Sequence, residues 1–152
     1  MEDVSARSAP PDQQAHELVG LANELVGRIW LHHQSRFAEF DLSASEAKAL
    51  LSLRPGTALS MRELSGQLHA NPSNVTVVVA RLEARGLLAR GGVDDRRVKS
   101  VRLTESGERT RHQLESRLME GHPVLYGLSP NQRNLLHGLL RRLSASGRQP
   151  PR

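Results

Sequence analysis

Helix-start signals recur at short intervals in the middle of this 152-residue chain, and they constrain its fold more than any other feature. Ser43-Ala-Ser-Glu46 and Ser60-Met-Arg-Glu63 are capping boxes, in which each side chain of the Ser–Glu pair bonds the other residue's backbone N–H. Asn71-Pro72 combines an N-cap asparagine with a proline at the first helical position. The sequence therefore predicts three short helices in succession. The third runs to Arg85 and is ended by Gly86, a glycine of the kind that commonly follows the last residue of a helix.

A short hairpin is predicted directly after these helices. Two strands, Leu87–Arg90 and Val98–Leu103, are joined by Gly91-Gly92-Val-Asp-Asp-Arg-Arg97. The second strand alternates apolar and basic residues, although imperfectly. Three helices followed by a hairpin is the order of a winged helix-turn-helix, in which a tight turn joins the last two helices, here His69–Pro72.

Longer helices flank this segment. Residues 13–38 place apolar side chains at helical spacing, Thr104 is the cap of a helix to about Glu120, and Ser129-Pro130-Asn-Gln132 is a further capping box. The last helix carries five leucines on one face. We therefore expect a mainly α-helical chain with a small β-hairpin wing.

The chain contains no cysteine, which excludes disulfides, thiolate metal sites and thiol-based redox sensing. No apolar run reaches the roughly 20 residues needed to span a bilayer. The polar, acidic N-terminus lacks the hydrophobic segment of a signal peptide. We expect a cytoplasmic protein with no membrane partner.

Positive charge is concentrated in one part of the sequence. The whole chain has a net charge of +5, and residues 71–102 contribute +4 of it, with seven basic and three acidic residues. The basic ones are Arg81, Arg85, Arg90, Arg96, Arg97, Lys99 and Arg102. A local cationic surface is what phosphate binding needs, although an ordinary solvated face can carry the same charges.

The third short helix begins with small polar residues, Ser73, Asn74 and Thr76. In helix-turn-helix proteins the first residues of this helix meet base edges in the major groove. Short side chains let the backbone approach the groove, and Val77 can contact a thymine methyl. The alternative is an ordinary helix with a polar start, because Ser and Asn are common near caps.

The hairpin tip carries Asp94, Asp95, Arg96 and Arg97. An arginine on a narrow tip can enter a minor groove, where a helix does not fit, and narrow grooves concentrate negative potential. Asp95 lies two residues before Arg97 and can hold its guanidinium by bidentate hydrogen bonds. The alternative is a solvated turn in which the two pairs of charges compensate each other.

These features occur together, and residues 42–107 resemble the winged-helix domain of the MarR family of bacterial transcription regulators. The most specific part of the resemblance is Asp95-Arg-Arg97 followed by Leu103-Thr104 and Gly107, which spans the wing and the next helix cap. The other matching stretches are Leu42-Ser-Ala-Ser-Glu46, Leu64–Leu68, Ser73-Asn-Val-Thr76 and Leu82-Glu-Ala-Arg-Gly-Leu-Leu88. The flanking helices fit the family's all-helical dimerisation region.

The resemblance implies a ligand-responsive homodimeric repressor that binds a pseudo-palindromic operator in double-stranded DNA, with half-sites roughly 34 Å apart. It implies that Arg97 enters the minor groove and that Asp95 orients it. The full set of expected contacts is Ser73, Asn74, Thr76, Val77 and Arg81 in the major groove, and Asp95, Arg96, Arg97 and Lys99 on the wing. Family members often have a basic residue where this chain has Val77, so the operator can differ from the common ones.

The resemblance, together with the Pro-, Ser- and Arg-rich composition of the two ends, suggests domain boundaries. The expected ranges are 1–12, a disordered tail; 13–40, an N-terminal dimerisation helix; 42–104, the winged helix-turn-helix domain; 105–145, C-terminal dimerisation helices; and 146–152, a second disordered tail.

Many proteins of this family release DNA when a small, often phenolic or anionic molecule binds between the dimer helices and the DNA-binding domain. The candidate pocket residues in this chain are Trp30, His33, Arg36 and Phe37, with His32 beside them. The alternative is that Trp30 and Phe37 pack the dimer core and that the histidines lie on the surface.

Three other functions were weighed. A metal-responsive regulator would use the histidines, but His32 and His33 are adjacent and point about 100° apart on a helix, and the others are scattered. A winged helix used only for protein–protein contact would need no positive surface. No phosphate loop, nucleophile elbow or metal-ligand spacing is visible, so we expect neither an enzyme nor a cofactor.

Overall fold

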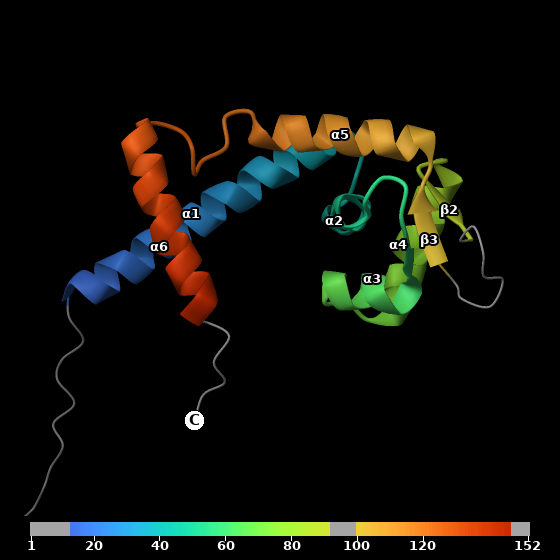
Figure 1. The fold of residues 1–152 in the computed structure, drawn as a ribbon, viewed down its shortest axis with the longest axis horizontal. Helices are drawn as coiled ribbons and strands as arrows, with labels where there is room; N and C mark the ends of the chain where they lie inside the picture. Colours follow the sequence, from blue (N-terminus) through green and yellow to red (C-terminus); the bar gives the residue numbers. More distant parts are fainter. Residues whose placement is uncertain (1–12, 92–99, 147–152) are drawn as a thin grey trace, which may run out of the picture. The chain divides into compact units, whose positions relative to one another are not determined.

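The computed structural model of this protein describes residues 13–91 and 100–146, which form six helices and three short strands. In chain order these are α1 Gln13–Ala38, α2 Ala44–Ser52, β1 Ala58–Ser60, α3 Met61–Leu68, α4 Pro72–Ala84, β2 Leu88–Arg90, β3 Ser100–Leu103, α5 Glu105–Met119 and α6 Pro130–Ser146 (Figure 1). This order confirms the mainly α-helical fold with a small β-hairpin. The two predicted tails lie outside the described residues, except for Ser146 at the end of α6.

The predicted helix starts are confirmed by their hydrogen bonds. The Ser43 hydroxyl accepts from the Glu46 N–H at 3.3 Å, and the Ser43 N–H donates to the Glu46 carboxylate at 2.8 Å. Ser60 and Glu63 repeat both bonds at the start of α3, at 3.2 and 2.8 Å. Asn71 caps α4 with its side-chain oxygen. Each cap satisfies backbone donors that a helix start would otherwise leave unpaired.

The sheet has three strands, one more than the predicted hairpin. The strand order is β1-β3-β2, and both pairings are antiparallel. In β1, Ala58 lies opposite Arg102, and in β2, Leu88 lies opposite Leu103. The prediction missed β1 because three residues are too few to show alternation, and because the partner strand is distant in sequence.

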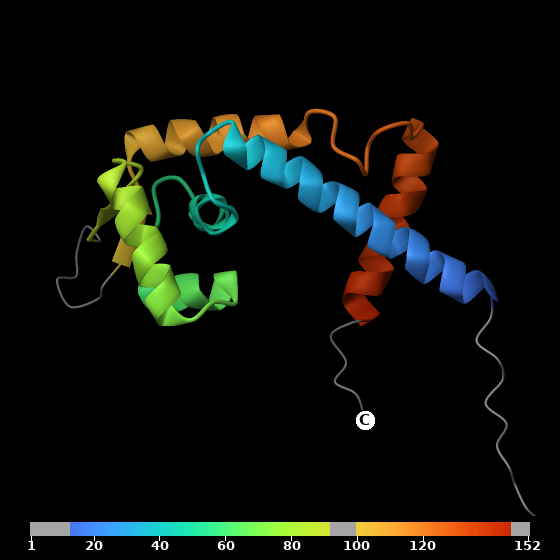
Figure 2. The same cartoon turned by 180° about the vertical axis from the view of Figure 1, so that it is seen from behind.

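The described chain divides into two compact units. Residues 32–122 form one unit, here called the head, and residues 13–31 with 123–146 form the other, here called the terminal unit. Within the head, α2, α3 and α4 pack against one another and α4 packs against β2 (Figure 2). Its largest fully buried side chains are Leu50, Leu53, Leu64, Leu82, Leu114, Val75, Val79 and Val101. The domain ranges expected from the resemblance stay predictions.

A close backbone approach holds the start of α5 against the turn after α4. Thr104 accepts from the Gly107 N–H at 3.0 Å and donates to the Gly86 carbonyl oxygen at 2.6 Å. The Thr104 N–H donates to the Leu87 carbonyl oxygen at 3.1 Å. A Cβ at Gly107 would overlap that same oxygen, so this approach requires glycine.

Candidate nucleic-acid interface

Helix α4 has one buried face that fixes its position in the head. Val75, Val79 and Leu82 are buried to 1% exposure or less and belong to the common core. The turn before α4 is tight because His69 adopts a left-handed conformation with φ of 47°. The His69 N–H donates to the Gly66 carbonyl oxygen at 3.2 Å and closes α3. The core contacts and the turn together leave the opposite face of α4 open to solvent.

The exposed face of α4 carries every residue that was predicted to meet the major groove. These are Ser73, Asn74, Thr76, Val77 and Arg81. Val77 is 51% exposed, which is unusual for a valine in a helix that also contributes to the core. Within α4, all of which the structure describes, the one acidic residue is Glu83, half-buried and ion-paired with Arg90 at 2.8 Å. The open face is therefore small, polar and free of negative charge.

The hydroxyl of Thr76 is already engaged within the helix. It donates to the Pro72 carbonyl oxygen at 3.0 Å. Since a hydroxyl has one proton, the oxygen of Thr76 can only accept a further hydrogen bond in this arrangement. A base edge that meets Thr76 therefore has to supply a donor, such as the amino group of adenine or cytosine.

The basic residues of this segment fall into two groups in the structure: some bond to other parts of the protein, and others are exposed to solvent. Arg85 donates to the carbonyl oxygens of Phe40 and Asp41, both at 2.8 Å, and thereby ties the end of α4 to the segment before α2. Arg90 is ion-paired with Glu83. Arg81 and Arg102 are exposed. Counting charges in the sequence therefore overstates the cations that face a ligand.

The predicted wing residues, Asp95, Arg96, Arg97 and Lys99, lie outside the described residues. The base of the hairpin is described. The Gly91 N–H donates to the Ser100 carbonyl oxygen at 3.0 Å, and Gly91 has a φ of +105°. Strands β2 and β3 therefore lead directly into the predicted wing.

The candidate ligand residues on α1 fall into different surroundings. Phe37 is buried in the head core, and the half-buried His33 ring lies 5.9 Å from it. Arg36 donates to the Glu39 carboxylate at 2.6 Å and to the Glu120 carbonyl oxygen at 3.2 Å. Trp30 is 58% exposed and belongs to the terminal unit.

Three histidines gather at one place in the head, which the sequence did not predict. The ring of His122 lies 5.4 Å from that of His32 and 5.5 Å from that of His33. His32 Nε2 is 2.9 Å from the Leu118 carbonyl oxygen. Among residues 13–91 and 100–146, no group of three or more histidines and carboxylates is arranged to hold a metal ion. No local pattern could have signalled the meeting, because His122 is distant in sequence.

We expect this histidine cluster to make the stability of the fold depend on pH. Burial lowers the pKa of His33 below its usual 6.5, as do the nearby His122, His32 and Lys48, and burial with His32 lowers the pKa of His122. The folded state therefore takes up protons less readily than the unfolded chain. Stability should fall as pH decreases below about 6.5 and level off below the lowered pKa values.

Urea unfolding at about pH 7.5 and pH 5.5 measures this effect. We expect a lower unfolding midpoint at the acidic pH, and a smaller difference in the His122→Gln variant. His112→Gln, at an exposed position on α5, is the matched control and should keep the full difference. An unchanged pH difference in His122→Gln would contradict the role of the cluster.

Comparison with known proteins gives a family match to part of the chain. Residues 42–99 match the model of the MarR family, and this range contains α2, α3, α4 and β2. The winged-helix segment therefore matches the MarR family, over less than half of the chain. MarR proteins are transcription regulators and not enzymes, as the sequence predicted.

Solved structures of MarR proteins share the fold of this chain. A MarR family protein from Bacillus stearothermophilus is 25% identical, with a TM-score of 0.79 over 93% of this chain and 100% of that one. BpsR from Bordetella bronchiseptica, whose DNA binding is regulated by 6-hydroxynicotinic acid, is 26% identical, with a TM-score of 0.60 over 82% and 98%. Apo MarR from E. coli, at 21% identity and a TM-score of 0.70 over 83% and 96%, shows the fold alone. A comparison with curated protein sequences finds no match.

Within residues 13–91 and 100–146, no helix combines sufficient length with sufficient apolar character to cross a bilayer.

Proposed function

We propose that this MarR protein is a homodimeric repressor that reads a pseudo-palindromic operator and leaves it when a small molecule binds. The observation that carries the proposal is the open face of α4, small, polar and free of negative charge, at the start of a helix held by the winged-helix core. DNA-binding regulation is the general function of MarR proteins. Repression is the family's common mode of action.

The proposed base contacts come from the first turns of α4. Ser73 and Asn74 can donate or accept hydrogen bonds, and Thr76 accepts. Val77 meets a thymine methyl in place of the cation that relatives often have there. Arg81 is exposed farther along the helix, where it can reach a phosphate.

The wing completes the reading of each half-site in this proposal. Arg97 enters the minor groove, with Asp95 holding its guanidinium, and Arg96 and Lys99 contact phosphates. Replacing Arg97 with alanine should weaken operator binding by about 1–3 kcal/mol, measured by fluorescence anisotropy. Arg109→Ala removes an exposed cation on α5 that pairs with Glu105, and should leave the affinity near that of the wild type. Near-unchanged affinity in Arg97→Ala would favour a winged helix that serves protein–protein contact only.

The apolar surface of the terminal unit supports a dimer. In the protomer, Leu18, Leu21 and Val26 of α1 are 60–64% exposed. Leu135 and Leu143 of α6 are 66% and 68% exposed. Monomeric proteins rarely leave contiguous apolar surface of this kind in water, and such surface marks an interface. We propose that a second copy covers it and places two α4 helices in successive major grooves.

Release by a small molecule is proposed by analogy with BpsR, whose DNA binding is regulated by 6-hydroxynicotinic acid. The residues proposed for an effector site near α1 are Trp30, His33, Arg36 and Phe37. A phenolic or anionic effector suits the guanidinium of Arg36 and a ring N–H of His33.

The decisive experiment compares two labelled duplexes, one from the upstream region of the protein's own gene and one scrambled. Anisotropy is measured at two salt concentrations, because phosphate contacts weaken steeply with salt whereas base contacts do not. Preference for the upstream duplex that survives at higher salt supports an autoregulator. Binding to neither duplex would contradict the proposal.

A further inference from the structure

Val77 stands apart from the other exposed apolar residues of the protein. Among the described residues of the head, 32–91 and 100–122, the only other large hydrophobic side chain with comparable exposure is Met119, at the end of α5. All the other large hydrophobic side chains that the structure describes as exposed belong to the terminal unit. The proposed dimer is formed by the terminal unit, so it gives no reason for an exposed valine in the middle of α4.

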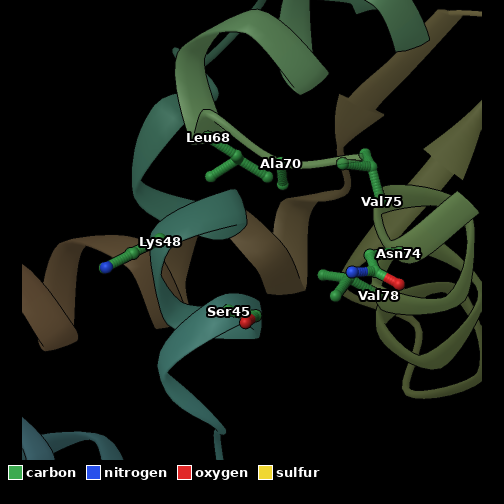
Figure 3. A pocket seen from close by; sticks show the side chains of 7 residues that line it. All are labelled: Ser45, Lys48, Leu68, Ala70, Asn74, Val75 and Val78. Carbon is green, nitrogen blue, oxygen red and sulfur yellow. The ribbon is translucent and has the colours of Figure 1, made fainter. Parts of the chain in front are cut away.

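The inward side of α4 is occupied by other residues. Asn74 and Val78 line a pocket of about 130 Å³, to which Lys48 of α2 also contributes (Figure 3). Thr76 and Val77 lie outside this lining, and both are exposed. These two adjacent residues are therefore on the part of α4 that a base edge can reach.

The Val77 side chain suits one particular group in the major groove. It has no atom that donates or accepts a hydrogen bond, so it gains nothing from the amino and carbonyl groups of the base edges. The apolar group that a base pair presents in this groove is the C5 methyl of thymine. Uracil and cytosine carry a hydrogen at C5, whereas 5-methylcytosine carries the same methyl as thymine. Contact with Val77 therefore favours the methylated member of each pair of bases.

Thr76 adds a requirement on the base that it meets. Its hydroxyl proton is bonded to the Pro72 carbonyl oxygen at 3.0 Å, so its oxygen accepts. The amino groups of adenine and cytosine can donate to this oxygen. Guanine and thymine present acceptors to the groove, and these would face a second acceptor. The pair of residues therefore suits an amino group close to a C5 methyl group.

We propose that Thr76 and Val77 make operator binding depend on the C5 methyl group of a pyrimidine at one position of each half-site. The protein then distinguishes thymine from uracil, and it also distinguishes 5-methylcytosine from cytosine. DNA methylated at cytosine C5 is accordingly a ligand of the same site as thymine-containing DNA. This inference rests on the proposed function, because α4 must lie in the major groove for the two contacts to form.

The first experiment selects duplexes from a random pool with the full-length wild type. We expect each selected half-site to contain a thymine beside a position that prefers adenine or cytosine. Selection repeated with Val77→Ala identifies the thymine position, because the preference should be lost there. Alanine favours a helix more than valine does, so this variant should fold. Thr76→Ser should keep the preference for adenine or cytosine, whereas Thr76→Val, which lacks the accepting oxygen, should lose it.

The second experiment uses four duplexes that differ at the thymine position alone. The pyrimidine there is thymine, uracil, cytosine or 5-methylcytosine, each with its complementary purine, and fluorescence anisotropy measures the affinities. For each half-site changed, we expect thymine to bind about fourfold more tightly than uracil, since one methyl group is no longer buried. 5-Methylcytosine should exceed cytosine by a similar ratio. Two independent comparisons thus measure the same methyl group.

Two variants assign the methyl effect to its residue. Both affinity ratios should fall close to unity in Val77→Ala. Arg81→Gln is the matched control, because Arg81 follows Val77 by one helical turn and is also exposed. This change removes a charge and keeps the valine, so it should weaken binding to all four duplexes while both ratios remain as in the wild type.

Each outcome bears on a different claim. A selected site whose affinity is unaffected by the C5 methyl would overturn this inference and leave the proposed function standing. Ratios that persist in Val77→Ala would overturn the assignment to Val77. A wild-type protein that selects no duplex would contradict the proposed function itself, and the inference with it.

Discussion

Replacing Gly107 with alanine is expected to destabilise the protein by at least about 3 kcal/mol, more than most single substitutions do. The new Cβ would overlap the Leu87 carbonyl oxygen and lie 3.0 Å from its carbon. Both atoms are backbone, so no side chain can rotate away to relieve the overlap. The helix would have to move and break the bonds that Thr104 makes to Gly86 and Gly107.

Chemical unfolding measures the loss, and the unfolding midpoint should drop sharply without a large change in the m-value. Gly66→Ala is the matched control, because Gly66 is exposed within α3 and a Cβ there would meet nothing within 4 Å. That substitution should stabilise the protein by up to about 1 kcal/mol. A Gly107→Ala protein as stable as the wild type would show that α5 does not approach Leu87 as described.

Replacing Leu139 with glutamate is expected to break the proposed dimer and to lower operator affinity by at least about 100-fold. Leu139 lies on the leucine face of α6 and is 47% exposed in the protomer. A carboxylate there would be buried without a partner in the interface, at a cost that favours separate protomers. A separate protomer contacts only one half-site, so it lacks the additional affinity that two linked protomers obtain by binding both half-sites together.

Analytical ultracentrifugation and anisotropy on the same samples check this result. Asn134→Glu adds the same charge on the opposite side of α6, so it should leave both the assembly and the affinity unchanged. A dimeric Leu139→Glu protein with normal affinity would show that α6 does not form the interface. A monomeric protein with normal affinity would contradict the need for two linked α4 helices.

Helix boundaries were the most predictable part of this protein. The capping hydrogen bonds join residues only three apart, Ser43 with Glu46 and Ser60 with Glu63. A helix start of this kind can therefore be predicted from a short stretch of sequence. The buried and exposed faces of α4 follow equally from the spacing of its valines and polar residues. The predicted groove-facing residues are exposed for this reason, although their contacts with DNA stay predictions.

Contacts between distant segments could not be read in the same way. Strand β1 exists because β3 offers an edge, and nothing in Ala58–Ser60 itself indicates a strand. Arg85 counted toward the positive charge of residues 71–102 in the sequence, but in the structure it donates to the carbonyl oxygens of Phe40 and Asp41. The sequence around a charged residue does not indicate its bonding partner, because tertiary packing determines which groups lie near its side chain.

The sequence by itself therefore determined the helices, their order and the resemblance to the MarR family, since caps, turns and amphipathic spacing act over a few residues. Tertiary structure alone decided which arginines remain exposed and that His122 meets His32 and His33. It also decided that Lys48 and Asn74 share a pocket. These outcomes depend on the packing of segments that are far apart in the chain, and short-range patterns carry no information about such distances.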